Sequence, residues 1–212
     1  MMVFGRVSER KPFILGLTGS IGMGKSAVAG MLRELSVPVF DADAAVHELQ
    51  GPDGACLAPI ERAFPGTTGS LGVDRQKLGA AVFGDPDKLR LLEAIVHPEV
   101  AEMRRAFLAD NADAPLIVFD IPLLFEKTGQ HGLNAVAVVS APAPIQRERV
   151  LARPGMTAEK FEKILALQVP DADKRARADF VINTGVPLAQ TRAQVAALVV
   201  HLRENGPWPL PN

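Results

Sequence analysis

The fold is decided by the stretch Phe13-Ile14-Leu15-Gly16-Leu17-Thr18-Gly19-Ser20-Ile21-Gly22-Met23-Gly24-Lys25-Ser26. An apolar run leads into a glycine-rich turn, and Lys-Ser ends the turn where a helical pattern begins. The spacing Gly19-x4-Gly24-Lys25-Ser26 fits the phosphate-binding loop G-x-x-x-x-G-K-[ST]. Glycines let backbone N–H groups turn inward as an anion-binding nest, and the next helix points its positive end at the same place. The stretch therefore predicts a nucleoside-triphosphate site, the alternative being a glycine-rich turn with a solvated lysine.

Each part of this loop has a predicted role. Lys25 can reach the β- and γ-phosphates of ATP, and the Ser26 hydroxyl can ligate Mg²⁺, which is the cofactor we expect. The residues predicted to bind ATP here are Gly19, Ser20, Ile21, Gly22, Met23, Gly24, Lys25, Ser26 and Ala27.

The bulk composition of the 212 residues is that of an ordinary globular protein, with 48% hydrophobic residues, 22% charged residues and a net charge of −1. This near-neutral balance argues against a dedicated nucleic-acid binder. The one cysteine, Cys56, excludes an internal disulfide and a cysteine-based zinc site, and we interpret it as a packing residue. The sequence has no signal-peptide pattern and no run near the roughly 20 apolar residues of a membrane helix, so we expect a cytoplasmic protein without membrane contact.

Five short apolar runs alternate with longer segments of helical spacing. This alternation indicates a parallel sheet covered on both faces, so we expect an α/β protein with the P-loop NTPase fold and a doubly wound, five-stranded parallel sheet. Ligands of such sheets bind beyond the carboxyl ends of the strands. The predicted strands are Phe13–Leu17, Val37–Phe40, Leu116–Phe119, Ala135–Val139 and Phe180–Ile182.

Two of the connections between these runs are much longer than a single crossover helix. The first has helical signals at Asp74–Val82 and Asp85–Asp113, where Pro98 is expected to kink or restart the helix. The second is rich in arginine and indicates a helical lid beside the phosphate site. We expect one domain at 12–204, with a core of 12–43, 114–142 and 178–204, a helical acceptor-binding insert at about 44–113, a lid at about 143–177, and flexible tails at 1–11 and 205–212.

Carboxylates after two strands are candidates for catalysis and metal binding. Asp41 and Asp43 follow the second run; Asp41 suits a helix N-cap, and Asp43 could take the proton of an attacking hydroxyl. Asp120 follows the third run and could lie beside the metal, or it could be an ordinary turn carboxylate.

The basic residues of the lid and two histidines point to a function less specifically than the phosphate loop does. Arg149 and Arg153 lie four residues apart on one predicted helical face and could neutralise charge on the transferring phosphate, or this could be a solvated helix face. Arg175 and Arg177 precede the last strand, where a nucleotide base could be covered. His47 and His97 are more often structural than catalytic.

Taken in order, several motifs resemble the dephospho-coenzyme A kinase family from about Phe13 to Arg203. After the loop at 17–26, they are Phe-Asp-Ala-Asp (40–43), Val-Asp-Arg-x-x-Leu-Gly (73–79), Leu-Glu-Ala-Ile-Val-His-Pro-Glu-Val (92–100), Asp-Ile-Pro-Leu-Leu-Phe-Glu (120–126), Gln-Arg-Glu-Arg (146–149), Gln168 and Lys-Arg-Ala-Arg-Ala-Asp-Phe-Val-Ile-Asn (174–183).

The resemblance implies ATP-dependent phosphorylation of the ribose 3′-hydroxyl of dephospho-coenzyme A, which gives coenzyme A and ADP. It implies that Asp43 is the base, that Lys25 and Arg149 complete the catalytic set, and that Arg177 also binds ATP. By the same resemblance, the acceptor is held by Asp43, Arg75, His97 and Pro122, and the metal by Ser26 and Asp120. His47 stands where the family frequently has arginine.

Two other functions remain open on the sequence. Another small P-loop kinase, acting on a nucleoside or nucleoside monophosphate, would share the loop and the lid. A nucleotide-binding regulator without catalysis would share the loop alone. The expected partners are ATP and dephospho-coenzyme A, and we favour a monomer.

Overall fold

The computed structural model describes residues 11–128 and 132–205. Contacts divide the chain into two compact units, one made of the chain up to Phe40 and from Asn111 onwards, the other of Asp41–Asp110. The second unit begins at 41 and ends at 110, where the sequence predicted an insert from about 44 to 113. Apart from residues 11 and 205, the predicted tails lie outside the described residues.

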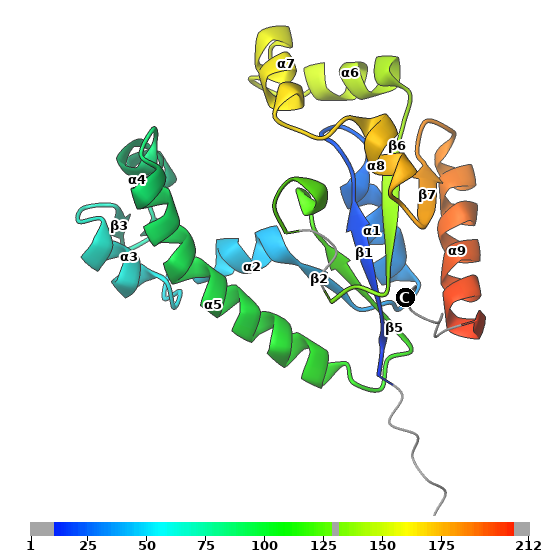
Figure 1. The fold of residues 1–212 in the computed structure, drawn as a ribbon, viewed down its shortest axis with the longest axis horizontal. Coiled ribbons are helices and arrows are strands. Elements are labelled where there is room, and N and C mark those ends of the chain that lie inside the picture. Colours follow the sequence, from blue (N-terminus) through cyan, green and yellow to red (C-terminus); the bar gives the residue numbers. More distant parts are fainter. Residues whose placement is uncertain (1–10, 129–131, 206–212) are drawn as a thin grey trace, which may run out of the picture. The chain divides into compact units, whose positions relative to one another are not determined.

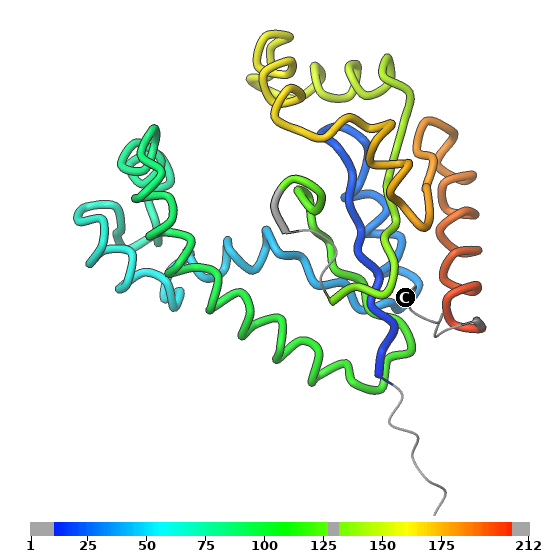
Figure 2. Tube along the Cα trace, viewed as in Figure 1, coloured from blue at the N-terminus to red at the C-terminus, as the bar shows by residue number. Residues whose placement is uncertain are grey.

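A five-stranded parallel sheet forms the centre of the first unit, in the order β2-β5-β1-β6-β7. Figures 1 and 2 show β1, which leads into the phosphate loop, between the traces of β5 and β6. The predicted sheet is therefore confirmed, and each apolar run contributes one strand. The strands are β1 (Phe13–Thr18), β2 (Val39–Asp41), β5 (Leu116–Asp120), β6 (Ala135–Ser140) and β7 (Phe180–Asn183).

Both faces of the sheet are covered by other elements. Each strand contributes to both layers, because its successive side chains point to opposite faces. Val139 and Ile182 pack in the core formed with α1 (Lys25–Glu34) and α9 (Leu188–Asn205). Val136 and Val138 point the other way, towards Leu124 in η1 (Leu124–Thr128), a wide π-type helical turn. On that side α8 (Asp171–Ala176) packs against β6. The sheet is thus doubly wound, as predicted.

The predicted lid segment contains three helices: α6 (Ala143–Leu151), α7 (Ala158–Ala166) and α8. Thr157 caps α7, because its hydroxyl accepts the Lys160 N–H at 3.2 Å. The side chain of Lys174 on α8 is fully buried. Because α8 also packs on β6, it belongs to the layer that covers the sheet, and we confine the proposed lid to α6, α7 and the turn between them.

The second unit is helical with one small ribbon. It consists of α2 (Ala42–Leu49), α3 (Leu57–Ala63), the antiparallel pair β3 (Thr68–Gly69) and β4 (Gly72–Val73), α4 (Arg75–Val82) and α5 (Pro86–Asp110). Cys56 is completely buried in its apolar core, which confirms the packing interpretation. The sequence predicted that Pro98 kinks or restarts this helix. Helix α5 continues through Pro98, so the restart was wrong, and the kink stays a prediction. Proline removes one hydrogen bond, that of the Ala94 carbonyl, while the turns on either side continue.

Strand β7 lies at the edge of the sheet, and α9 covers its end with one side chain. The Asn183 N–H donates to Gln194 Oε1 at 3.0 Å, and Gln194 Nε2 donates to the Asn183 carbonyl at 3.0 Å. Both polar backbone groups of Asn183 are therefore bonded to the same amide.

In the described part of the chain, no helix is long and apolar enough to cross a membrane.

Candidate active site

The phosphate loop needs its glycines for two reasons, conformation and space. Gly22 and Gly24 have φ angles of 78° and 83°, in the left-handed region that other residues rarely adopt. A Cβ at Gly22 would lie 2.4 Å from Val150 Cγ2, and a Cβ at Gly19 would lie 2.7 Å from the Val139 carbonyl oxygen. These glycines allow the loop to turn tightly against α6 and β6, directly before α1 begins at Lys25.

Lys25 and Asp120 form an ion pair beside this loop. Lys25 is the first residue of α1, and Asp120 ends β5, where it lies opposite Leu17 in the register with β1. The Asp120 side chain is 3% exposed and that of Lys25 is 17% exposed. Two residues predicted to act on phosphate and metal thus meet at the carboxyl edge of the sheet. Lys25 has three N–H donors, so this pairing leaves donors for a phosphate.

The residues available for Mg²⁺ fit a metal that is held mainly by nucleotide phosphates. The described residues contain no group of three or more histidine, cysteine, aspartate or glutamate side chains that could bind a metal. The Ser26 side chain is exposed in the first turn of α1, and the Asp120 carboxylate lies next to Lys25. Mg²⁺ usually takes one or two protein oxygens and completes its shell with water and substrate phosphates.

Thr184 connects Arg149 with the phosphate loop. Arg149 on α6 donates to the Thr184 carbonyl at 2.6 Å and to its hydroxyl at 3.2 Å. The Thr184 hydroxyl in turn donates to the Met23 carbonyl at 2.7 Å. The structure therefore places Arg149 against the loop. Arg153 is not on the same helical face as predicted, because α6 ends at Leu151.

Sequence reasoning assigned no role to Thr184, although it follows the last predicted strand. It is buried, and its N–H donates at 2.9 Å to the carbonyl of Ser140, the last residue of the neighbouring strand β6. A Cβ on Gly24 would lie 3.3 Å from its hydroxyl oxygen. The rule that ligands bind beyond the carboxyl ends of the strands was the signal that could have identified it.

Two glutamines hold the tip of the loop, and they too were assigned no role. The Ile21 N–H donates to Gln168 Oε1 at 3.0 Å. Gln146 Nε2 donates to the Ile21 carbonyl at 2.7 Å. The motifs that contain Gln146 and Gln168 were recognised in the sequence, but their distance from the loop along the chain concealed the contact.

A buried ion pair fixes the segment that carries Gln168. Lys174 Nζ lies 2.8 Å from Glu126 Oε1, which also accepts the Val169 N–H at 2.9 Å. Burial raises the pKa of Glu126, but Lys174 and the Val169 N–H outweigh burial and hold that pKa below its usual value. Beside this pair, the Arg177 guanidinium lies 4.2 Å from the centre of the Phe125 ring.

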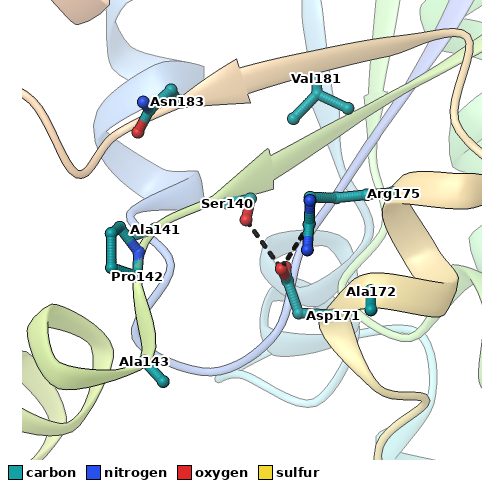
Figure 3. Close-up of a pocket in the computed structure, with 9 residues that line it drawn as sticks. All are labelled: Ser140, Ala141, Pro142, Ala143, Asp171, Ala172, Arg175, Val181 and Asn183. Carbon is teal, nitrogen blue, oxygen red and sulfur yellow. Dashed lines mark hydrogen bonds and ion pairs between the residues drawn. The ribbon is translucent and has the colours of Figure 1, made fainter.

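An open cavity of about 500 Å³ lies at the ends of β6 and β7. Figure 3 shows Asp171 between Ser140 and Arg175, which donate to its carboxylate at 2.8 Å each. Val181 and Asn183 line it, and they alternate with the core residue Ile182, so the cavity opens on the face away from α1 and α9. That Arg175 covers a nucleotide base stays a prediction.

The predicted acceptor residues lie in the second unit, with the exception of Pro122. Asp41 caps α2, because its carboxylate accepts the Ala44 N–H at 3.0 Å, while Asp43 is exposed in the first helical turn. His47, one turn further along α2, contacts Arg75 at the start of α4. Asp43, His47 and Arg75 are thus brought near one another, since residues four apart share a helix face.

The remaining two acceptor residues have different surroundings. His97 is exposed on α5. Pro122 belongs to the first unit, where its carbonyl accepts the Thr18 hydroxyl at 3.2 Å, at the edge of the sheet that carries Asp120. The pairing of Asp43 with the phosphate loop stays a prediction.

Comparison with known proteins identifies the family of this chain. The family model described as "Dephospho-CoA kinase" matches residues 13–189. A dephospho-CoA kinase of Novosphingobium aromaticivorans is 70% identical over 197 residues, covering 93% of this chain and 98% of its own. One of Mesorhizobium japonicum is 54% identical over 192 residues, covering 90% and 96%.

Solved structures are similar over nearly the whole chain. The crystal structure of TT1252 from Thermus thermophilus has a TM-score of 0.80 at 36% identity and covers 90% of this chain and 97% of its own. A dephospho-CoA kinase of Campylobacter jejuni has a TM-score of 0.63 at 22% identity, covers 91% and 98%, and supports the fold alone. From the family match and the identities of its relatives, the chain belongs to the dephospho-CoA kinase family of P-loop kinases.

Proposed function

We propose that this chain transfers the γ-phosphate of ATP to the ribose 3′-hydroxyl of dephospho-coenzyme A, giving coenzyme A and ADP in the final step of coenzyme A biosynthesis. The observation that carries the proposal is the family match over residues 13–189, which includes the loop, Asp43, Asp120 and Arg149. The proposal includes action as a monomer in the cytoplasm.

In this reaction the 3′-oxygen attacks the γ-phosphorus, the bond from phosphorus to the ADP oxygen breaks, and the hydroxyl proton passes to the Asp43 carboxylate. An exposed carboxylate in the first turn of α2 suits this role, because it is open to a substrate. Arg75, which contacts His47, would hold the acceptor together with His97 and Pro122. That the second unit holds the acceptor is part of this proposal.

On the ATP side, phosphoryl transfer depends mainly on positioning and charge neutralisation. Lys25 and the loop amides would bind the transferring phosphate, while Asp120 keeps the Lys25 ammonium at the edge of the sheet. Arg149, held by Thr184, would add positive charge beside the loop, and Arg177 would complete the nucleotide site. Ser26 would ligate Mg²⁺, with Asp120 beside it; when bound, the metal neutralises charge on the β- and γ-phosphates.

A coupled assay of ADP release tests the proposal. We expect turnover that requires both ATP and dephospho-coenzyme A, with none when a nucleoside or nucleoside monophosphate replaces the acceptor. Removal of Mg²⁺ by a chelator should abolish turnover, and its re-addition should restore it. Turnover with nucleosides alone would assign the chain to another small-molecule kinase activity, and ATP binding without turnover would indicate a regulator.

A further inference from the structure

The Ile21 peptide groups are held by two side chains that come from different elements. Gln146 lies on α6, is 4% exposed, and donates to the Ile21 carbonyl at 2.7 Å. Gln168 follows α7 and accepts the Ile21 N–H at 3.0 Å. One glutamine therefore serves as a donor and the other as an acceptor, although the two side chains are chemically identical.

These contacts determine which way the neighbouring peptides point. In a trans peptide the C=O and the N–H point in opposite directions. Because the Ile21 carbonyl points at Gln146, the N–H of Gly22 points away from α6. Among the described residues no hydrogen bond uses that Gly22 N–H, although Gly22 is buried. A buried N–H without a partner is costly unless a ligand accepts it.

The other contact fixes the preceding peptide. The Ile21 N–H points at Gln168, so the Ser20 carbonyl points the other way, where it accepts the Met23 N–H at 3.1 Å. That bond closes the turn of the loop. Gln168 is itself placed by its neighbour, because the Val169 N–H is bonded to Glu126 and Glu126 is paired with the buried Lys174.

We propose that Gln146 and Gln168 are positioning residues of the nucleotide site, which orient the peptides around Ile21 so that the Gly22 N–H faces a bound phosphate. The proposal deepens the proposed function and rests on it for the identity of the nucleotide. It assigns opposite polarities to the two amides: position 146 must donate and position 168 must accept.

This polarity gives a test that separates positioning from simple packing. A glutamate has nearly the size of glutamine, but its ionised carboxylate can only accept hydrogen bonds and cannot donate them. We expect Gln168→Glu to keep ADP affinity within about twofold of wild type, because its carboxylate still accepts the Ile21 N–H. Gln146→Glu should weaken ADP binding roughly tenfold, because a carboxylate faces the Ile21 carbonyl. The added charge is the same in both, so charge alone would affect them alike.

Leucine variants and a matched control complete the series. Gln146→Leu and Gln168→Leu should each weaken ADP binding and raise the KM for ATP roughly three- to tenfold, as expected for one lost hydrogen bond, with the KM for dephospho-coenzyme A unchanged. Gln190→Leu makes the same change at an exposed position on α9 and should have no effect. In addition, hydrogen exchange of the Ile21 amide should accelerate in Gln168→Leu and not in Gln168→Glu.

The proposal is overturned if both glutamate variants change ADP affinity equally, or if both leucine variants bind ADP as wild type does. Isothermal titration with ADP needs no acceptor, so the outcome is independent of the phosphorylated substrate. Suppose that the variants show the predicted pattern of ADP affinities but the enzyme does not phosphorylate dephospho-coenzyme A. This result would support the positioning roles of Gln146 and Gln168 and refute the proposed function. Melting temperatures of all five variants identify any loss of affinity that arises from unfolding.

Discussion

The buried pair of Lys174 and Glu126 offers a sharp test of how the first unit is stabilised. Replacement of Lys174 by Met keeps an apolar chain in the site but removes the ammonium 2.8 Å from Glu126 Oε1. Loss of one partner of a buried pair costs about 3–5 kcal/mol, because the other charge stays buried. Glu126 is 10% exposed and keeps the Val169 N–H, so we expect the lower end, about 3 kcal/mol.

Urea unfolding followed by far-UV circular dichroism measures this loss, and a loss of this size should lower the melting temperature by about 6–12 °C. The control is Lys163→Met, which breaks an ion pair of 2.7 Å to Glu159 whose two side chains are 74% and 78% exposed. An exposed pair contributes roughly 0–1 kcal/mol. The double variant Lys174→Met with Glu126→Leu should recover most of the stability, since it buries no charge.

The effect should also depend on pH, with a sign set by Glu126. Its pKa in the folded wild type lies below the ordinary value of 4.5, so its contribution to stability is present above that value and is lost as pH falls through the folded pKa. Without Lys174, burial remains and raises this pKa, so acid protonates the buried charge. The deficit of Lys174→Met should be largest near pH 7.5 and shrink towards pH 4.5. A pH-independent deficit, or one no larger than that of Lys163→Met, would refute the reasoning.

Three further predictions concern catalysis and the thiol. Asp43→Asn should lower kcat on the order of 10²-fold or more with little change in the KM for ATP. The control Asp53→Asn, in an exposed turn, should leave kcat unchanged. An unchanged kcat in Asp43→Asn would remove Asp43 from the role of base. Arg149→Ala should cost roughly 2–4 kcal/mol of transition-state stabilisation by kcat/KM. Arg147→Ala, which breaks an exposed pair with a glutamate, is its control, and equal kinetics of the two would mark Arg149 as a surface residue. The pKa of the Cys56 thiol is raised mainly by burial and also by a nearby glutamate. A thiol reagent should therefore label the folded enzyme slowly and the urea-unfolded enzyme fast. Rapid labelling of the folded enzyme would contradict the burial of Cys56.

The strands were predictable because each is a short, nearly continuous apolar run; β1, β5 and β6 are buried almost throughout, while β2 and β7 at the two edges are partly exposed. The phosphate loop was predictable because its glycines have fixed spacing. The ribbon of β3 and β4 was missed because strands of two residues show no periodicity. Local propensity predicted a kink or a restart at Pro98, but α5 continues through it because apolar contacts along the helix outweigh one lost hydrogen bond.

Motifs in the sequence named Lys25 and Asp120, and the structure brings these two residues together as an ion pair. The contacts of Thr184, Gln146 and Gln168 join positions more than a hundred residues apart, and their geometry arises only when the sheet is assembled. Polar side chains that bind backbone have no periodic signature. The family resemblance marked Gln146 and Gln168, but not Thr184, and it did not indicate what the two glutamines contact.

The amide of Gln194 also bears on how copies of this protein behave at high concentration. An edge strand invites pairing with another chain, because its backbone groups form a ready template for a further strand. At the end of β7, Gln194 donates to and accepts from Asn183 as a neighbouring strand would. A strand approaching that end would first have to displace both bonds. One side chain thus shields the end of the sheet from edge-to-edge aggregation without adding a strand of its own.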